Sequence, residues 1–212
     1  MPRIVLIFIS AVTLSAPILA STAHFERKCG VEFSVLPKWQ AIRESRDDQS
    51  EYVLCKIAVQ PLHWATILKK SRERWDDAPN HPLLVFVFTP STSYEQALDD
   101  VGFEEDEFGR GLGFESWHGQ FVTGEPYTGG GLTGLAAHTV FRGFIRDQSL
   151  RRPEESGVFT GGIDHIVLKT PAGRIIGFEC AGSTPDARVD CRQVIQLVAE
   201  SLRFVTLPAP PN

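Results

Sequence analysis

Positive charge is scarce in this chain of 212 residues, which holds 21 lysines and arginines against 26 acidic residues and carries a net charge of −5. A protein that binds nucleic acid needs a strongly basic face to neutralise phosphates, so this balance argues against that class of partner. Disorder and coiled coil are also excluded, because 42% of the residues are hydrophobic and only 22% are charged. The composition is that of an ordinary globular protein.

The sequence also lacks the short motifs that most directly predict chemistry. It has no G-x-S-x-G nucleophile elbow, no H-E-x-x-H or H-x-x-x-H metal pair and no C-x₂-C zinc pair. The glycine-rich run at residues 129–134 lacks the Gly-Lys-Ser/Thr ending of a phosphate loop. We therefore expect neither a metal nor a cofactor, and no residue is assigned a catalytic role.

Long apolar runs are absent except at the N-terminus. The run at residues 4–14 is too short to cross a membrane of about 30 Å as a helix. Ser21 and Ala23 suit the small-residue positions of a signal peptidase site, so we predict a signal peptide over residues 1–23. Cleavage after Ala20 and a retained membrane anchor are the alternatives. The mature chain is expected to be exported, periplasmic or secreted, without a membrane span.

Cysteine is limited to four positions, Cys29, Cys55, Cys180 and Cys191. An even number in an exported chain favours disulfides, which would remove the thiols as nucleophiles. We predict the pairs Cys29–Cys55 and Cys180–Cys191, because the members of each pair are close in sequence. The first pair requires a bend in the intervening chain, and Pro37 is the candidate for it. A zinc site is the competing interpretation.

One domain is predicted for residues 24–206, followed by a Pro-rich, disordered tail at residues 207–212. Residues 123–134 hold five glycines and are interpreted as a mobile hairpin connection or surface loop. Alternating or continuous apolar runs predict strands at residues 31–35, 39–42, 52–59, 83–88, 114–122, 135–145, 163–168 and 174–180.

Helical periodicity appears in three places. A short helix is predicted within residues 62–75, and Thr92 with Glu95 fits the capping box of a second helix. Thr184 followed by Pro185 has the pattern of a cap and first helical residue for the last helix. One face of this helix is predicted to carry the apolar residues Cys191, Val194, Ile195, Val198 and Leu202. Strands outnumber helices without alternating with them. We therefore predict the α+β class, with a largely antiparallel twisted sheet packed against two or three helices.

Histidine and tryptophan supply the candidate pocket. Trp117 and His118 lie beside the glycine-rich segment, where an aromatic ring and an imidazole can line a small pocket. His138 lies between apolar neighbours and can act as a base or ligand, with a hydrogen-bonded sheet histidine as the structural alternative. Asp164 and His165 are adjacent and could join a triad assembled through space, although a solvent-facing pair at a strand edge is the simpler interpretation.

Three features carry a resemblance to a known family. A strand is followed by the segment LPKW at residues 36–39, a capped helix follows a central strand, and a final helix closes in SLRF at residues 201–204. This layout resembles the Mog1/PsbP-like superfamily of small exported bacterial proteins and covers most of residues 31–205. The resemblance implies a sheet of about six or seven mostly antiparallel strands between helices.

The predicted function is that of an exported, disulfide-stabilised binding or accessory protein, as members of that superfamily mainly are. Its partner would be an unknown protein or a small ligand. A secreted small hydrolase that uses His118, His138 or His165 with a distant acid is one alternative. A periplasmic inhibitor or immunity-type protein is another, suggested by the glycine-rich segment and the negative net charge.

Overall fold

The structure, a computed structural model, describes most of the chain between residues 22 and 205. The predicted signal segment up to Ser21, the predicted pocket residues Trp117 and His118, and the tail at residues 207–212 lie outside the described residues. The described ranges are 22–26, 29–44, 50–67, 69, 82–106, 109–112, 122–144, 158–181, 183–184, 187–188 and 190–205.

A seven-stranded sheet forms the centre of the molecule, and each neighbouring pair of its strands is antiparallel. The apolar run of its central strand LLVFVF is covered on both faces, as such runs require. The predicted α+β class and the largely antiparallel sheet are confirmed. In spatial order the strands are β3 (Trp39–Arg43), β4 (Val53–Pro61), β5 (Leu83–Phe88), β12 (Ile175–Ala181), β11 (Val158–Lys169), β10 (Leu132–Phe144) and β9 (Glu125–Gly129).

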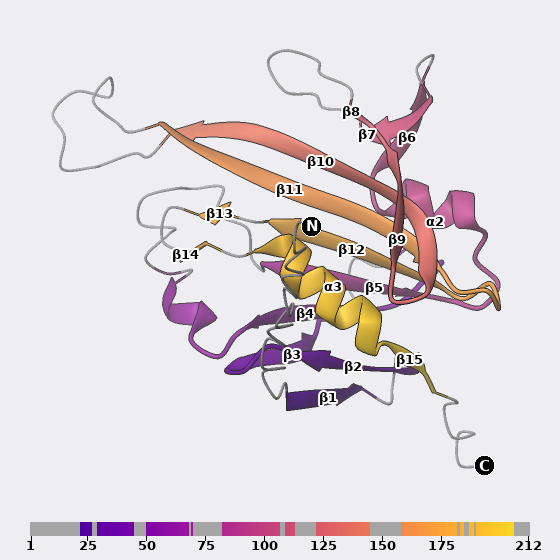
Figure 1. Cartoon of the computed structure of the whole chain (residues 1–212), viewed down its shortest axis with the longest axis horizontal. Coiled ribbons are helices and arrows are strands. Elements are labelled where there is room, and N and C mark those ends of the chain that lie inside the picture. Colours follow the sequence, from indigo (N-terminus) through magenta and orange to yellow (C-terminus); the bar gives the residue numbers. More distant parts are fainter. Residues whose placement is uncertain are drawn as a thin grey trace, which may run out of the picture.

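One face of this sheet is covered by α3 (Cys191–Ser201) and a small sheet (Figure 1). The small sheet contains β1 (Thr22–Glu26), β2 (Val31–Val35) and β15 (Arg203–Phe204). The helix buries a stripe at helical spacing, as predicted, and this stripe packs into one apolar cluster with the sheet. The buried residues of α3 are Cys191, Val194, Ile195, Val198 and Ala199, and its C-cap Leu202 is buried as well.

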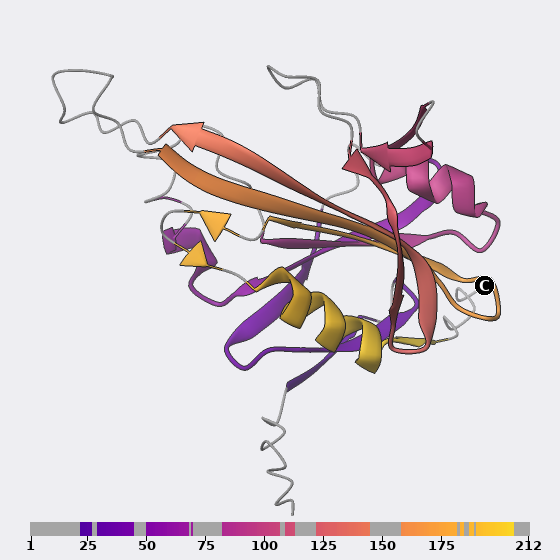
Figure 2. The same cartoon turned by 45° about the horizontal axis from the view of Figure 1, so that its top comes forward.

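The opposite face is covered by α2 (Tyr94–Asp100), as Figure 2 shows from a second direction. Beside the helix lies a three-stranded sheet of β6 (Phe103–Asp106), β7 (Gly109–Leu112) and β8 (Val122–Thr123). The β6–β7 hairpin was not predicted, because its sequence has no clear apolar alternation. A second apolar cluster forms on this face from α2, β6, β7 and the outward side chains of the central sheet.

Both helix caps differ from the prediction. The capping box of α2 consists of Ser93 and Gln96 rather than Thr92 and Glu95. The N-cap of α3 is Asp190, whose carboxylate accepts a hydrogen bond from the backbone N–H of Gln193 at 3.1 Å.

The last helix therefore begins later than predicted. Thr184 instead belongs to a two-stranded sheet of β13 (Ser183–Thr184) and β14 (Ala187–Arg188). In the first predicted helix, residues 64–67 are helical. None of the helices within the described ranges is long and apolar enough to cross a membrane.

The two predicted disulfides, Cys29–Cys55 and Cys180–Cys191, are both present. The first ties the segment before β2 to β4, and the second ties β12 to the start of α3. The required bend lies at the predicted place, where the backbone N–H of Trp39 donates to the carbonyl of Leu36 at 3.0 Å. The zinc interpretation of these cysteines is excluded, because no cysteine of the chain is free.

Candidate functional site

The hairpin of β9 and β10 forms one wall of the candidate site. Gly130 and Gly131 make its two-residue turn with φ angles of 59° and 77°, a left-handed conformation that favours glycine. Gly130 also packs against α3, where an added Cβ atom would overlap the carbonyl group of Ala199. The predicted connection at residues 123–134 is therefore a hairpin, but most of it belongs to β9 and β10, and only its two-residue turn connects the strands and packs against α3.

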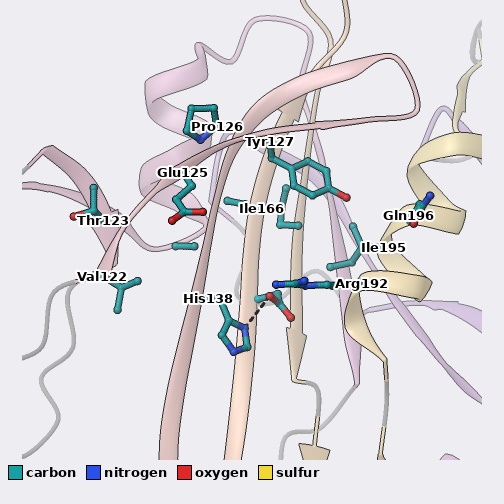
Figure 3. A pocket seen from close by; sticks show the side chains of 13 residues that line it. Val122, Thr123, Glu125, Pro126, Tyr127, His138, Ile166, Arg192, Ile195 and Gln196 are labelled. Atoms are coloured by element: carbon teal, nitrogen blue, oxygen red, sulfur yellow. Dashed lines mark hydrogen bonds and ion pairs between the residues drawn. The ribbon is translucent and has the colours of Figure 1, made fainter.

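A pocket of about 400 Å³ lies between this hairpin, β11 and α3 (Figure 3). Its apolar part includes Ile166 of β11 and Ile195 of α3, both buried. Polar side chains from four elements surround this apolar part: Glu125 and Tyr127 on β9, His138 on β10, Asp164 on β11, and Arg192 and Gln196 on α3. A concave site with apolar surface and a few polar groups is the usual form of a small-molecule site.

His138 and Asp164 form the most specific polar contact in the pocket. They occupy directly opposite positions on β10 and β11, so their side chains lie on the same face of the sheet. Nδ1 of His138 lies 2.9 Å from Oδ1 of Asp164. The carboxylate side chain is 16% exposed and the imidazole 50%. This contact fixes one ring nitrogen of His138 and leaves the other accessible.

Tyr127 is half-buried and lies within the electrostatic reach of charges on both sides of the pocket. Burial is the main cause that raises the pKa of its phenol above the ordinary value of 10.0, and Glu200 adds to the rise. Arg192 opposes this rise in pKa, whereas Asp164 reinforces it. The phenol hydroxyl therefore stays protonated and can donate a hydrogen bond at neutral pH.

Glu125 and Arg192 present opposite charges on opposite walls. Figure 3 shows Glu125 on the hairpin side of the pocket and Arg192 reaching in from the helix. Within the part of the chain that the structure describes, neither charged group forms a hydrogen bond or an ion pair. Both side chains are exposed, and so is Gln196, whose amide donates to Oε1 of Glu200 at 2.7 Å.

The predicted pocket residues are placed only in part. His138 lines the pocket, whereas Trp117 and His118 fall outside the described residues. Asp164 and His165 do not act together, because adjacent residues of a strand point to opposite faces. His165 lies on the α2 face, with its Nδ1 at 2.9 Å from the carbonyl oxygen of Val101.

Sequence reasoning missed Glu125, Tyr127, Arg192 and Gln196. Only the helical residues carried a usable signal, since Arg192, Ile195 and Gln196 have the i, i+3, i+4 spacing of one helix face. Comparison of the chain with protein-family models, with curated proteins and with solved structures gives no match.

Proposed function

We propose that this chain is an exported, disulfide-stabilised binding protein, with the pocket between the β9–β10 hairpin and α3 as its ligand site. The observation that carries the proposal is the convergence of polar side chains from four elements around a buried apolar surface. Such a pocket can take up the apolar part of a ligand and fix its orientation through hydrogen bonds. The volume of about 400 Å³ fits a small molecule rather than a folded partner.

Export is part of this proposal. Two disulfides in one small domain support an oxidising destination, because intracellular thiols are normally kept reduced. The predicted cleavage after Ala23 would remove Thr22 and Ala23 from β1, whereas cleavage after Ala20 would leave this strand complete. A relationship to the Mog1/PsbP-like superfamily is also proposed, supported by an antiparallel sheet with a helix on each face.

Intact-mass measurement on protein expressed with its own N-terminus tests the export proposal. We expect a chain that starts at residue 24 or residue 21 and gains four hydrogens on reduction, two for each disulfide. A full-length chain with free thiols, recovered from the cytosol, would overturn it.

The ligand site is tested by nuclear magnetic resonance of ¹⁵N-labelled protein against a panel of amino acids, monosaccharides and dicarboxylates. We expect chemical-shift changes that concentrate on β9, β10, β11 and the first half of α3. Ala136→Leu fills the pocket and should abolish these changes, whereas Ala65→Leu at an exposed helical position should preserve them. Shift changes elsewhere, or changes insensitive to Ala136→Leu, would contradict the proposal.

Hydrolysis is the second candidate function, and the contact between His138 and Asp164 favours it. A carboxylate that orients an imidazole leaves the second ring nitrogen free to take a proton from water. Two observations rank this function below binding. Among the described residues, no serine or cysteine lines the pocket, where Thr123 and Tyr127 supply the hydroxyls. In Figure 3 the second ring nitrogen of His138 points away from Tyr127 and Arg192.

Hydrolysis of p-nitrophenyl acetate separates the two functions. As a binding protein, the parent chain should hydrolyse the ester no faster than its His138→Gln variant. If the parent turns over the ester and His138→Gln does not, catalysis by this histidine replaces binding as the function of the pocket.

A further inference from the structure

The charges around the pocket constrain what it can bind. Arg192 supplies one positive charge on the helix wall, whereas Glu125 and Asp164 supply negative charge on the sheet side. Asp164 already accepts from His138, but Glu125 and Arg192 form no hydrogen bond or ion pair with another described residue. No ion pair joins these two residues to each other.

We propose that the pocket binds a small zwitterion, an α-amino acid with an apolar side chain. The ligand carboxylate would face Arg192 and Gln196 on α3, and the ligand ammonium group would face Glu125 on β9. The apolar side chain would rest on Ile166 and Ile195. This inference rests on the proposed binding function and names the class of its ligand.

Ligands with a single charge fit these walls less well. An anion that reached Arg192 would also approach two carboxylates, and like charges at short range disfavour binding. A cation that reached Glu125 would leave Arg192 without a counter-charge and would add a second positive charge to the same pocket. A zwitterion supplies a counter-charge to each wall, a carboxylate for Arg192 and an ammonium group for Glu125.

Size and hydrogen bonding agree with this class. The volume of about 400 Å³ lies near the lower end of the range for small-molecule sites. The protonated hydroxyl of Tyr127 and the amide of Gln196 add hydrogen-bonding groups on the two walls. The apolar area of Ile166 and Ile195 favours a branched aliphatic side chain over a polar one.

Four matched compounds test the charge requirement in calorimetric titrations of the oxidised protein. L-leucine carries both charges, leucinamide only the ammonium group, N-acetyl-leucine only the carboxylate, and N-acetyl-leucinamide neither. We expect L-leucine to bind most tightly and the affinity to fall about tenfold for each charge that is removed. This factor is the lower end of the range for the contribution of a hydrogen bond to a charged group. Equal affinity of leucinamide or N-acetyl-leucine would overturn the inference.

Two variants then assign each charge to its wall. In Arg192→Gln, L-leucine and leucinamide should bind equally, while the preference over N-acetyl-leucine persists. In Glu125→Gln, L-leucine and N-acetyl-leucine should bind equally, while the preference over leucinamide persists. Two variants serve as matched controls and should behave as the parent, Arg43→Gln on the opposite edge strand β3 and Glu95→Gln on α2. Preferences that ignore Arg192 and Glu125 would overturn the assignment.

Failure of this inference is distinguishable from failure of the proposed function. If N-acetyl-leucinamide or a sugar binds in a manner that Ala136→Leu abolishes, the pocket is a binding site but its ligand is not a zwitterion. If no compound shifts the resonances of the pocket residues, both the ligand class and the binding function are wrong.

Discussion

The two faces of the central sheet are held in different ways. The α3 face carries both disulfides and the pocket, and it is covered by segments from the two ends of the chain. There β2 and β15 pair directly, and the backbone N–H of Ser34 donates to Oγ of Ser201 at 2.8 Å. The α2 face is covered by α2, which follows β5 after a short turn.

The difference follows from the cost of closing long loops. Contacts between segments that are distant in sequence must offset a larger loss of chain entropy than contacts between neighbours. On the α3 face, the two disulfides offset this loss of chain entropy. The α2 face relies on packing and polar contacts, such as the Tyr94 hydroxyl donating to the Val167 carbonyl at 2.9 Å and Arg110 paired with Asp99 at 2.7 Å.

Removal of the disulfides should have the largest effect on stability. Their sequence separations of 26 and 11 residues correspond to about 3 kcal/mol each in the chain-entropy account. We expect Cys29→Ala/Cys55→Ala and Cys180→Ala/Cys191→Ala each to lose about that much free energy of unfolding in urea. Unfolding midpoints equal to that of the parent would show that the bonds do not hold the α3 face.

Truncation of Leu98 probes the α2 face in the same experiment. This side chain of α2 is 4% exposed and packs in the cluster that contains no disulfide. Leu98→Ala should lose about 3 kcal/mol through lost burial and the cavity left behind. Because Leu98 and the disulfides belong to different apolar clusters, reductant should destabilise the variant and the parent equally. A smaller effect of reductant on the variant would mean that the two faces are coupled.

The two turn glycines offer a finer comparison on the α3 face. Both have a positive φ, but a Cβ atom at Gly130 would overlap α3, whereas a Cβ at Gly131 meets no atom within 4 Å. Gly131→Ala should cost about 1 kcal/mol from the backbone conformation alone. Gly130→Ala should cost roughly 1–2 kcal/mol more, because the hairpin must move off α3. Equal urea midpoints for the two variants would contradict a seated hairpin.

The cap of α2 is the matching fine detail on the other face. Ser93→Ala removes the acceptor for the Gln96 backbone N–H and should cost about 1 kcal/mol. Glu95→Gln should leave the urea midpoint nearly unchanged, because Glu95 does not take part in the capping box. If Glu95→Gln lowered the urea midpoint more than Ser93→Ala does, the capping box would consist of Thr92 and Glu95, as the sequence pattern predicts.

Local sequence information was sufficient for six of the seven strands of the central sheet, for the buried stripe of α3 and for the disulfide pairs. It failed where two local patterns fitted the sequence equally well and a tertiary contact determined which one formed. Thr92–Glu95 and Ser93–Gln96 both fit the capping pattern, but the buried Thr92 hydroxyl donates to the carbonyl of Tyr52 at 3.1 Å. Ser93 therefore caps the helix. The local sequence cannot predict this, because the deciding contact is with Tyr52, which is distant in the sequence.

The site was less predictable than the fold because it depends on register and on docking. His138 and Asp164 are 26 residues apart, and they meet only because β10 and β11 pair in one particular register. Glu125 and Arg192 face the same pocket only because the hairpin turn at Gly130 packs against α3. Neither arrangement leaves a spacing that a motif search would find.

The two faces also differ in how they respond to high pH, the smallest effect that we expect. Burial raises the pKa of Tyr94 on the α2 face, and burial followed by Glu200 raises that of Tyr127 on the α3 face. A phenol whose pKa is higher in the folded state contributes its full stability below the unfolded value of about 10 and loses it as the pH rises further. The free energy of unfolding should therefore fall as the pH rises above about 10. Tyr94→Phe and Tyr127→Phe should each reduce this loss of stability in urea titrations.

Glu200 provides a control for Tyr127, because its charge helps to raise the pKa of that phenol. Glu200→Gln should reduce the loss of stability at high pH when Tyr127 is present and should have no such effect in the Tyr127→Phe variant. An unchanged slope in both phenylalanine variants would show that neither phenol is protected from ionisation by the fold.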